Sequence, residues 1–405
     1  MNKYAWLGMV SAVSLAVSAT LHTPVNAEEY KASERAVQLA QDNMLIDTHI
    51  DVPYRLTEHW EDVTKATASG DFDYPRAVAG GLNVPFMSIY IPAQLEQTPG
   101  ASKQLAHRLI DSMEALAWRA PEKFAMAYDV ADVEEQFEQG LMSIALGMEN
   151  GSPMEGDMAN LKEFYDRGIR YITLSHSLSN HIADSSYDIR RQWDGLSPFG
   201  KELVKEMNNI GMMIDISHVS DDAFWQTLEI SEAPVIASHS SLRRYTPGFE
   251  RNMSDAMIKA LGENGGVIMI NFGSTFVTQA ANRYRDMINQ QIEQVKAKYG
   301  EDSEEAKAQI AELQKDNPFP YATLEQVLDH IDHVVKLIGI DHVGIGSDYD
   351  GVGDSLPVGL KDVSTYPNLV QGLLDRDYSE ADIKKILNEN LLRVWREVEA
   401  YAEQH

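Results

Sequence analysis

The chain has 405 residues, of which 44% are hydrophobic and 24% are charged, so it is long enough to bury a large globular core. Its 62 acidic and 34 basic residues give a formal net charge of −28 at pH 7, which argues against nucleic acid and anionic membrane surfaces as partners. There is no cysteine, which excludes disulfides and thiolate metal ligands.

Residues 1–27 have the pattern of a removable secretory signal peptide. Lys3 precedes the apolar run YAWLGMVSAVSLAVSATL, and small residues follow it ahead of Glu28. Ser, Thr and Gly dilute this run, whereas a permanent span needs about 20 strongly apolar residues. We therefore expect export to the periplasm or the medium, with one domain over residues 28–405. The chain ends in WREVEAYAEQH, so we expect no stable membrane anchor after signal removal.

Short runs rich in Val, Ile, Leu and Met recur along the mature chain and predict eight β-strands. Amphipathic segments with helical periodicity lie between most of them, as at 102–120, 199–211 and 255–265. Several runs are continuously apolar, which is typical of parallel strands covered by helices. This alternation predicts an α/β fold, a (β/α)8 barrel of the TIM type. The predicted strands are 44–49, 82–91, 142–149, 169–176, 212–218, 233–239, 266–272 and 341–348.

The seventh predicted strand is followed by residues 280–317, which are rich in Glu, Gln, Lys and Ala. This composition favours helix, and the segment predicts a helical hairpin broken at Tyr299 and Gly300. Such an insertion would rise beside the mouth of the barrel, as a lid or as a subunit contact. A solvated excursion without either role is an equally good interpretation. The sequence also leaves open whether the chain forms a homodimer.

Histidine or a carboxylate stands at the end of most of the predicted strands. Because the carboxyl ends of parallel barrel strands meet on one face, we expect these side chains to meet in one mouth. Taken singly, a histidine at a strand end is more often a hydrogen-bonded rim residue than a metal ligand. The converging residues are His49, Asp51, Glu149, His176, His218, His239 and Asp348.

The first of these strands lies in the stretch MLIDTHIDVPYR (44–55). Side chains in a strand alternate between faces, which predicts that Asp47, His49 and Asp51 share one face. Asp47 lies deepest in the strand, so we expect it to orient His49 or to bond nearby backbone.

Five of the converging residues offer nitrogen and oxygen ligands that suit zinc or a similar divalent ion. Five ligands are more than one tetrahedral ion can bind. Two ions that share one carboxylate ligand would account for all five. We expect His49 and Asp51 on one ion and His218 and His239 on the other. Glu149 would bridge the two, and such a pair of ions can activate water for hydrolysis.

Seven short motifs of the chain are similar to motifs of the membrane dipeptidase family and occur in the same order as in that family. The family, also called renal dipeptidases, belongs to the metal-dependent amidohydrolase-like barrels. Each motif is weak alone, but the ordered set is specific, and it extends to YPNL and ENLLRVW near the C-terminus. The resemblance therefore covers nearly all of the mature chain. The motifs are DTHID (47–51), GMENG (147–151), TLSHS (173–177), DISHVS (215–220), VIASHSS (235–241), RNMSD (251–255) and HVGIGSDYDGV (342–352).

The resemblance implies a zinc-dependent dipeptidase that hydrolyses short dipeptides, including those with a C-terminal D-residue, by attack of a metal-bridging hydroxide. It implies two Zn²⁺ ions bridged by Glu149. His176 would polarise the scissile carbonyl, and Asp348 would pass a proton to the departing amine. Arg251, assisted by Asn252, would bind the substrate's C-terminal carboxylate. These roles agree with general chemistry, since amide hydrolysis needs an oxyanion stabiliser and a proton donor, and a guanidinium grips a carboxylate.

Two alternatives stay open at this point. One is another binuclear amidohydrolase, such as a lactonase or a cyclic amidase, although many of those bridge their metals with a carboxylated Lys instead of a residue such as Glu149. The other is a non-catalytic exported metal-binding protein, which would need neither Asp348 nor Arg251. One departure from the family concerns NFGSTF (271–276), where Phe276 follows a strand at which relatives can carry Tyr, so a phenol contact to the substrate is in doubt.

Overall fold

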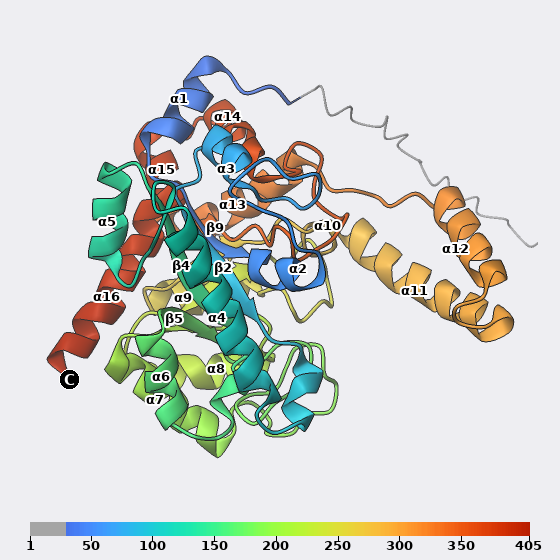
Figure 1. The fold of residues 1–405 in the computed structure, drawn as a ribbon, viewed down its shortest axis with the longest axis horizontal. Coiled ribbons are helices and arrows are strands. Elements are labelled where there is room, and N and C mark those ends of the chain that lie inside the picture. Colours follow the sequence, from blue (N-terminus) through green and yellow to red (C-terminus); the bar gives the residue numbers. More distant parts are fainter. Residues whose placement is uncertain (1–29) are drawn as a thin grey trace, which may run out of the picture.

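The structure is a computed structural model that describes residues 30–405 (Figure 1). The predicted signal peptide, residues 1–27, lies outside the described residues. Within residues 30–405, no helix is long and apolar enough to cross a membrane.

Eight parallel strands form the predicted barrel, and all eight sequence predictions are confirmed. The last strand returns to the first, where Ile50 bridges Tyr349 and the backbone N–H of Asp348 donates to the carbonyl of His49 at 3.1 Å. A short additional strand, β3 (Phe124–Met126), was not predicted and pairs with β4 outside the barrel. The barrel order is β1 (Ile46–Ile50), β2 (Val84–Tyr90), β4 (Met142–Glu149), β5 (Ile169–Thr173), β6 (Met213–Asp215), β7 (Ile236–Ser240), β8 (Val267–Ile270) and β9 (Val343–Ile345).

Helices surround the barrel and follow most of its strands (Figure 1). Side-chain caps start several of them, as at α13, where Thr323 and Gln326 form a reciprocal capping box. The helices are α1 (Glu34–Asp42), α2 (Val52–Glu58), α3 (Tyr74–Gly80), α4 (Ala101–Arg119), α5 (Val130–Glu138), α6 (Ala159–Asp166), α7 (Pro198–Ile210), α8 (Asp221–Ile230), α9 (Asp255–Glu263), α10 (Ser274–Val277), α11 (Gln279–Tyr299), α12 (Glu304–Asp316), α13 (Leu324–Ile338), α14 (Tyr366–Asp375), α15 (Glu380–Lys384) and α16 (Asn390–Gln404).

The amino-terminal end of the barrel is filled with apolar side chains and closed by α16. Phe86 of β2 lies 5.7 Å from Tyr171 of β5 and 5.3 Å from Trp395 of α16, measured between ring centroids. The side-chain amides of Asn388 and Asn390 donate to the carbonyls of Met44 and Val343, which precede or begin strands β1 and β9. One end of the barrel is therefore sealed, and the opposite, carboxyl end is left for a site.

The insertion after β8 is a helical hairpin, as predicted. Helix α11 ends at Tyr299, Gly300 follows with φ at 94°, and α12 begins at Glu304. The hairpin extends away from the barrel, and only its base lies against the body (Figure 1). Ala281 and Ile288 are its buried residues on α11, with Ala306 on α12.

His330 of α13 is completely buried and joins three parts of the chain. Its Nδ1 accepts from the backbone N–H of Leu242 at 3.1 Å, and its Nε2–H donates to the carbonyl of Val277 at 3.0 Å. Burial lowers the pKa of His330 to about 4, so the imidazole is neutral in the fold. The loop after β7 and the end of α10 are thereby held to α13.

This burial predicts a pH-dependent contribution to stability. The folded pKa lies below the unfolded value, so the contribution is present above about pH 6.5 and is lost as the pH falls toward 4. Between pH 7 and pH 5, His330 should cost the fold about 2 kcal/mol. We expect the metal-free His330→Gln variant, whose amide can replace both hydrogen bonds, to lose less stability over this interval than the metal-free wild type.

The measurement is the free energy of unfolding in urea at pH 7 and pH 5. Equal losses in the two proteins would show that His330 is not a source of acid sensitivity.

Candidate active site

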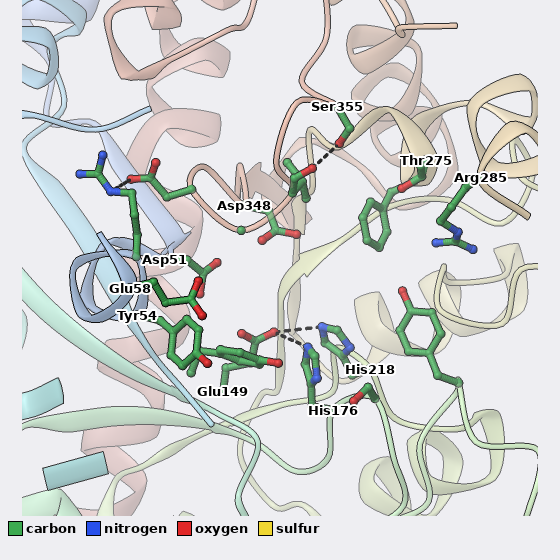
Figure 2. A pocket seen from close by; sticks show the side chains of 18 of the residues that line it. Asp51, Tyr54, Glu58, Glu149, His176, His218, Thr275, Arg285, Asp348 and Ser355 are labelled. Atoms are coloured by element: carbon green, nitrogen blue, oxygen red, sulfur yellow. Dashed lines mark hydrogen bonds and ion pairs between the residues drawn. The ribbon is translucent and has the colours of Figure 1, made fainter. Parts of the chain in front are cut away.

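The carboxyl ends of the strands open into a cavity of about 850 Å³ (Figure 2). Five of the residues predicted for the site line it, and the remaining two strand-end histidines, His49 and His239, lie beneath them, 0% and 1% exposed. The predicted convergence of the strand ends is therefore present in the structure. The five lining residues are Asp51, Glu149, His176, His218 and Asp348.

Glu149, at the end of β4, lies at the centre of this cluster and is 4% exposed. Its Oε1 lies 3.1 Å from Nε2 of His218 and 3.3 Å from Nε2 of His239, and its Oε2 lies 3.4 Å from Nε2 of His49. His176 approaches Oε1 at 3.3 Å (Figure 2). The two carboxylate oxygens thus face different sets of histidines, which is the geometry expected of a bridging ligand.

His49 is oriented by a tyrosine that sequence reasoning missed. The hydroxyl of Tyr171 donates to the carbonyl of Thr48 at 2.9 Å, so it accepts the Nδ1–H of His49 at 2.8 Å. Nε2 then faces Asp51 and Glu149, each at 3.4 Å. Among residues 30–405 this buried Nε2 has no hydrogen-bond partner, which fits a metal ligand. Tyr171 stands in a predicted strand, but its sequence context resembles that of an ordinary core residue.

His239 is oriented in a similar way by Ser238 and Asp215. The Ser238 hydroxyl donates to Asp215 at 2.6 Å and lies 2.7 Å from Nδ1 of His239, from which it accepts. Asp215 is fully buried and also accepts from the backbone N–H groups of Ser217 and Ser238. The Nε2 lone pair of His239 is therefore directed toward Glu149. Asp215 lies within the DISHVS motif, and sequence reasoning gave it no role.

His218 brings a second imidazole to the same point. Its Nε2 lies 2.8 Å from Nε2 of His239, and burial, Arg251 and His176 hold the pKa of His218 well below its usual value. Neutral imidazoles whose nitrogens converge on one carboxylate oxygen form a donor set that a divalent cation fits. The three clusters able to hold an ion among the described residues all belong to this site.

Two of the site residues have backbone conformations that side chains usually avoid. His218 has φ at 70° and Asp348 has φ at 66°, both in the left-handed region. Such a conformation costs of order 1 kcal/mol or more and is retained where the surrounding structure imposes it. Here it directs two side chains at the strand ends into the cavity.

Asp348 lies beside Asp51, because the strands that precede the two residues are neighbours in the barrel. Asn271 donates to its Oδ2 at 2.7 Å, and burial raises the pKa of Asp348 to about 7, with Asp51 and Glu149 adding to the increase and His49 opposing it. A side chain at Gly351 would collide with both aspartates, so only glycine fits there. A carboxyl group that titrates near neutrality suits proton transfer.

The side chains of strand β1 do not alternate regularly between its two faces. Regular alternation would put Asp47, His49 and Asp51 on one face. Its pairing with β2 shifts register between Asp47 and Ile50. The Asp47 carboxylate accepts from the Tyr366 hydroxyl of α14, whereas the His49 ring turns into the barrel. The prediction is wrong for Asp47, which does not share the face of His49 and Asp51, because the register shift interrupts the period of two. The expected support is confirmed, since Asp47 also accepts from the backbone N–H of His49 at 3.0 Å.

Arg251 and Asn252 lie behind the wall of the cavity. The η-nitrogens of Arg251 donate to the Ser240 hydroxyl and the His239 carbonyl, each at 2.7 Å, and its Nε is buried without a partner among residues 30–405. Asn252 is fully buried, and its amide nitrogen donates to Thr246 and to the Phe276 carbonyl. The amide of Asn252 is therefore already used within the protein.

A barrel with this donor set at its carboxyl end defines a metal-dependent hydrolase. The chain matches the family model described as membrane dipeptidase (peptidase family M19) over residues 33–405. It is 32% identical to Dipeptidase 3 of Mus musculus over 381 residues, covering 92% of this chain and 68% of that protein. The chain belongs to the membrane dipeptidase family and is a metallo-dipeptidase that hydrolyses peptide bonds.

Solved structures agree with this assignment. The probable dipeptidase PvdM from Pseudomonas aeruginosa is 27% identical, with a TM-score of 0.78 and coverage of 91% of this chain and 98% of that one. A metallo peptidase from Rhodobacter sphaeroides, liganded with a phosphinate mimic of the dipeptide L-Ala-D-Ala, has a TM-score of 0.72 at 23% identity, covering 88% of this chain and 99% of that one. The second likeness shows a shared fold.

The hydrogen bond from His49 to Tyr171 predicts a specific defect in metal binding. Tyr171→Phe should leave the fold intact and weaken metal affinity about 10- to 100-fold, because the imidazole loses the partner that sets its tautomer and orientation. Tyr349→Phe is the matched control, since Tyr349 is equally buried but its hydroxyl bonds Thr365 instead of a candidate ligand.

The measurement is competition with a metal chelator, followed by metal analysis of each variant. Unchanged affinity in Tyr171→Phe would mean that Tyr171 does not orient a ligand.

Proposed function

We propose that this metallo-dipeptidase uses two Zn²⁺ ions to hydrolyse short dipeptides, including those with a C-terminal D-residue. The observation that carries the proposal is the central position of Glu149, whose two oxygens face His49 on one side and His218 with His239 on the other. This arrangement supports a bridging carboxylate between two metal positions.

In this proposal, His49 and Asp51 hold one ion, His218 and His239 hold the other, and Glu149 bridges them. When bound, the two ions supply an activated water molecule and electrophilic assistance to the scissile carbonyl. The unpartnered Nε2 of His49 and the converging Nε2 atoms of the other two histidines support this ligand set.

The remaining residues act on the substrate. His176, whose side chain is 17% exposed in the cavity wall, polarises the scissile carbonyl and stabilises the developing oxyanion. Asp348, whose carboxylate Asn271 holds at the cavity, passes a proton to the departing amine. Arg251 binds the C-terminal carboxylate through its guanidinium, and Asn252 positions Arg251 by fixing the adjoining loop.

The proposed acceptance of a C-terminal D-residue has separate support. The Rhodobacter sphaeroides structure of the same fold carries a mimic of L-Ala-D-Ala.

Phe276 lines the cavity where relatives can carry Tyr, so a phenol contact to the substrate is missing at this position. We further propose export by the signal at residues 1–27, to the periplasm or the medium.

The same metal site could serve two functions other than dipeptide hydrolysis. A lactonase or cyclic amidase would act on substrates without a free carboxylate, and a non-catalytic metal-binding protein would not need a proton donor. The position of Asp348 in the cavity and that of Arg251 beside His239 favour the dipeptidase over both.

The test combines metal analysis with a substrate panel. The purified mature protein should contain about two metal equivalents and cleave L,L- and L,D-dipeptides, lose activity with a chelator, and regain it with Zn²⁺. C-terminally amidated dipeptides should react at least tenfold more slowly, because the carboxylate contact is lost. Cleavage that survives complete metal removal, or a lactone cleaved in place of every dipeptide, would contradict the proposal.

The proposed proton donor can be tested separately. Asp348→Asn should lower kcat by about 10²- to 10⁴-fold, because the amide cannot deliver the proton, while the metal content stays near that of the wild type. Asp354→Asn is the control, since Asp354 lies a few residues along the same loop but is largely exposed and does not line the cavity.

The readouts are steady-state kinetics and metal analysis of both variants. If Asp348→Asn lost its metal along with its activity, Asp348 would be a ligand and the assigned role would be wrong.

A further inference from the structure

The base of the helical hairpin contributes directly to the active-site cavity. Tyr284, Arg285 and Ile288, all on α11, line the same cavity as Glu149 and His176. The remainder of the hairpin extends away from the barrel (Figure 1). The first turns of α11 thus form part of the wall of the site, a role that differs from the lid, the subunit contact and the solvated excursion considered from the sequence.

Arg285 presents a cation to this cavity that the fold does not neutralise. Its side chain is 32% exposed, and its ion pair among the described residues is with the adjacent Asp286, at 3.4 Å and 70% exposed. An exposed pair of this kind contributes little. The guanidinium lies 5.1 Å from the ring centroid of Phe249, which fixes its position at the wall.

Arg251, which lies behind the wall of the cavity, is on the same side as Arg285. Arg251 packs over Phe276 at 5.3 Å, and the rings of Phe276 and Phe249 are 5.8 Å apart. Tyr187, 5.9 Å from Phe249, interacts with both guanidinium groups. Two cations therefore share one aromatic wall.

The opposite wall carries the carboxylate of Glu58 and, at the proposed metal site, that of Asp51. Asp51 and Glu58 lie on that side with Tyr54, and Arg285 lies across the cavity from them (Figure 2). A dipeptide in such a field is oriented with its carboxylate end toward the two arginines. One carboxylate can satisfy Arg251, which leaves the guanidinium of Arg285 available to a second anionic group on the same residue of the substrate.

We propose that Arg285 is a specificity-determining residue that binds the side-chain carboxylate of the substrate's C-terminal residue, so that dipeptides of the type Xaa-Asp or Xaa-Glu are preferred. This rests on the proposed function, with Arg251 on the α-carboxylate. A charge-assisted hydrogen bond in a partly enclosed site discriminates against the neutral amide analogue, because the amide leaves the guanidinium without its counter-charge.

The experiment compares kcat/KM for pairs that differ only in charge: L-Ala-L-Glu with L-Ala-L-Gln, and L-Ala-L-Asp with L-Ala-L-Asn. The wild type should favour the acidic member of each pair by about tenfold. In Arg285→Gln the ratio should fall to about one, and in Arg285→Lys it should be intermediate, since the charge remains without the planar fork. The change should appear mainly in KM for the acidic substrates.

Arg283→Gln is the matched control, because Arg283 lies on the same helix, is exposed and does not line the cavity. It should retain the wild-type ratio. A wild type without preference for the acidic member, or a ratio in Arg285→Gln equal to that of the wild type, contradicts the role of Arg285 and leaves the dipeptidase proposal intact. A wild type that cleaves none of the four dipeptides contradicts both proposals.

Discussion

The structure depends on the burial of one carboxylate among histidines at the end of a barrel strand. Glu149 is nearly inaccessible, and each of its oxygens faces imidazole nitrogens at 3.1–3.4 Å. Burying a charge is costly unless it is paired, so the carboxylate requires positive charge close to it. The imidazoles pair with the carboxylate directly, and together these residues form a donor set that could bind metal.

The residues behind the ligands determine which nitrogen each histidine presents. The Tyr171 hydroxyl does this for His49, and the Ser238–Asp215 pair does it for His239. Asn271 fixes the Asp348 carboxylate in the same manner. None of these partners faces a substrate, yet each selects one tautomer or orientation from several. Buried residues of the barrel wall therefore determine the tautomers and orientations of the side chains at the site.

The sequence was sufficient to predict the strands, their parallel order and the residues that converge, because hydrophobic periodicity and strand-end position are local properties. It could not predict the register shift in β1, which separates Asp47 from His49, since such a shift depends on the neighbouring strand. Nor could it separate Tyr171 from other core tyrosines or place Arg285 in the cavity, because both depend on contacts between distant segments. The strand β3 is only three residues long and carries little signal.

The pairing of β1 with β9 has a consequence for assembly. The half of the site that holds His49, Asp51 and Asp348 is joined by the hydrogen bond from the backbone N–H of Asp348 to the carbonyl of His49. These residues lie about 300 positions apart, so this half of the site exists only after the longest loop in the barrel has closed. Asp348 therefore joins His49 and Asp51 only once the last strand of the barrel is in place, and a truncated or unfinished chain lacks a full site.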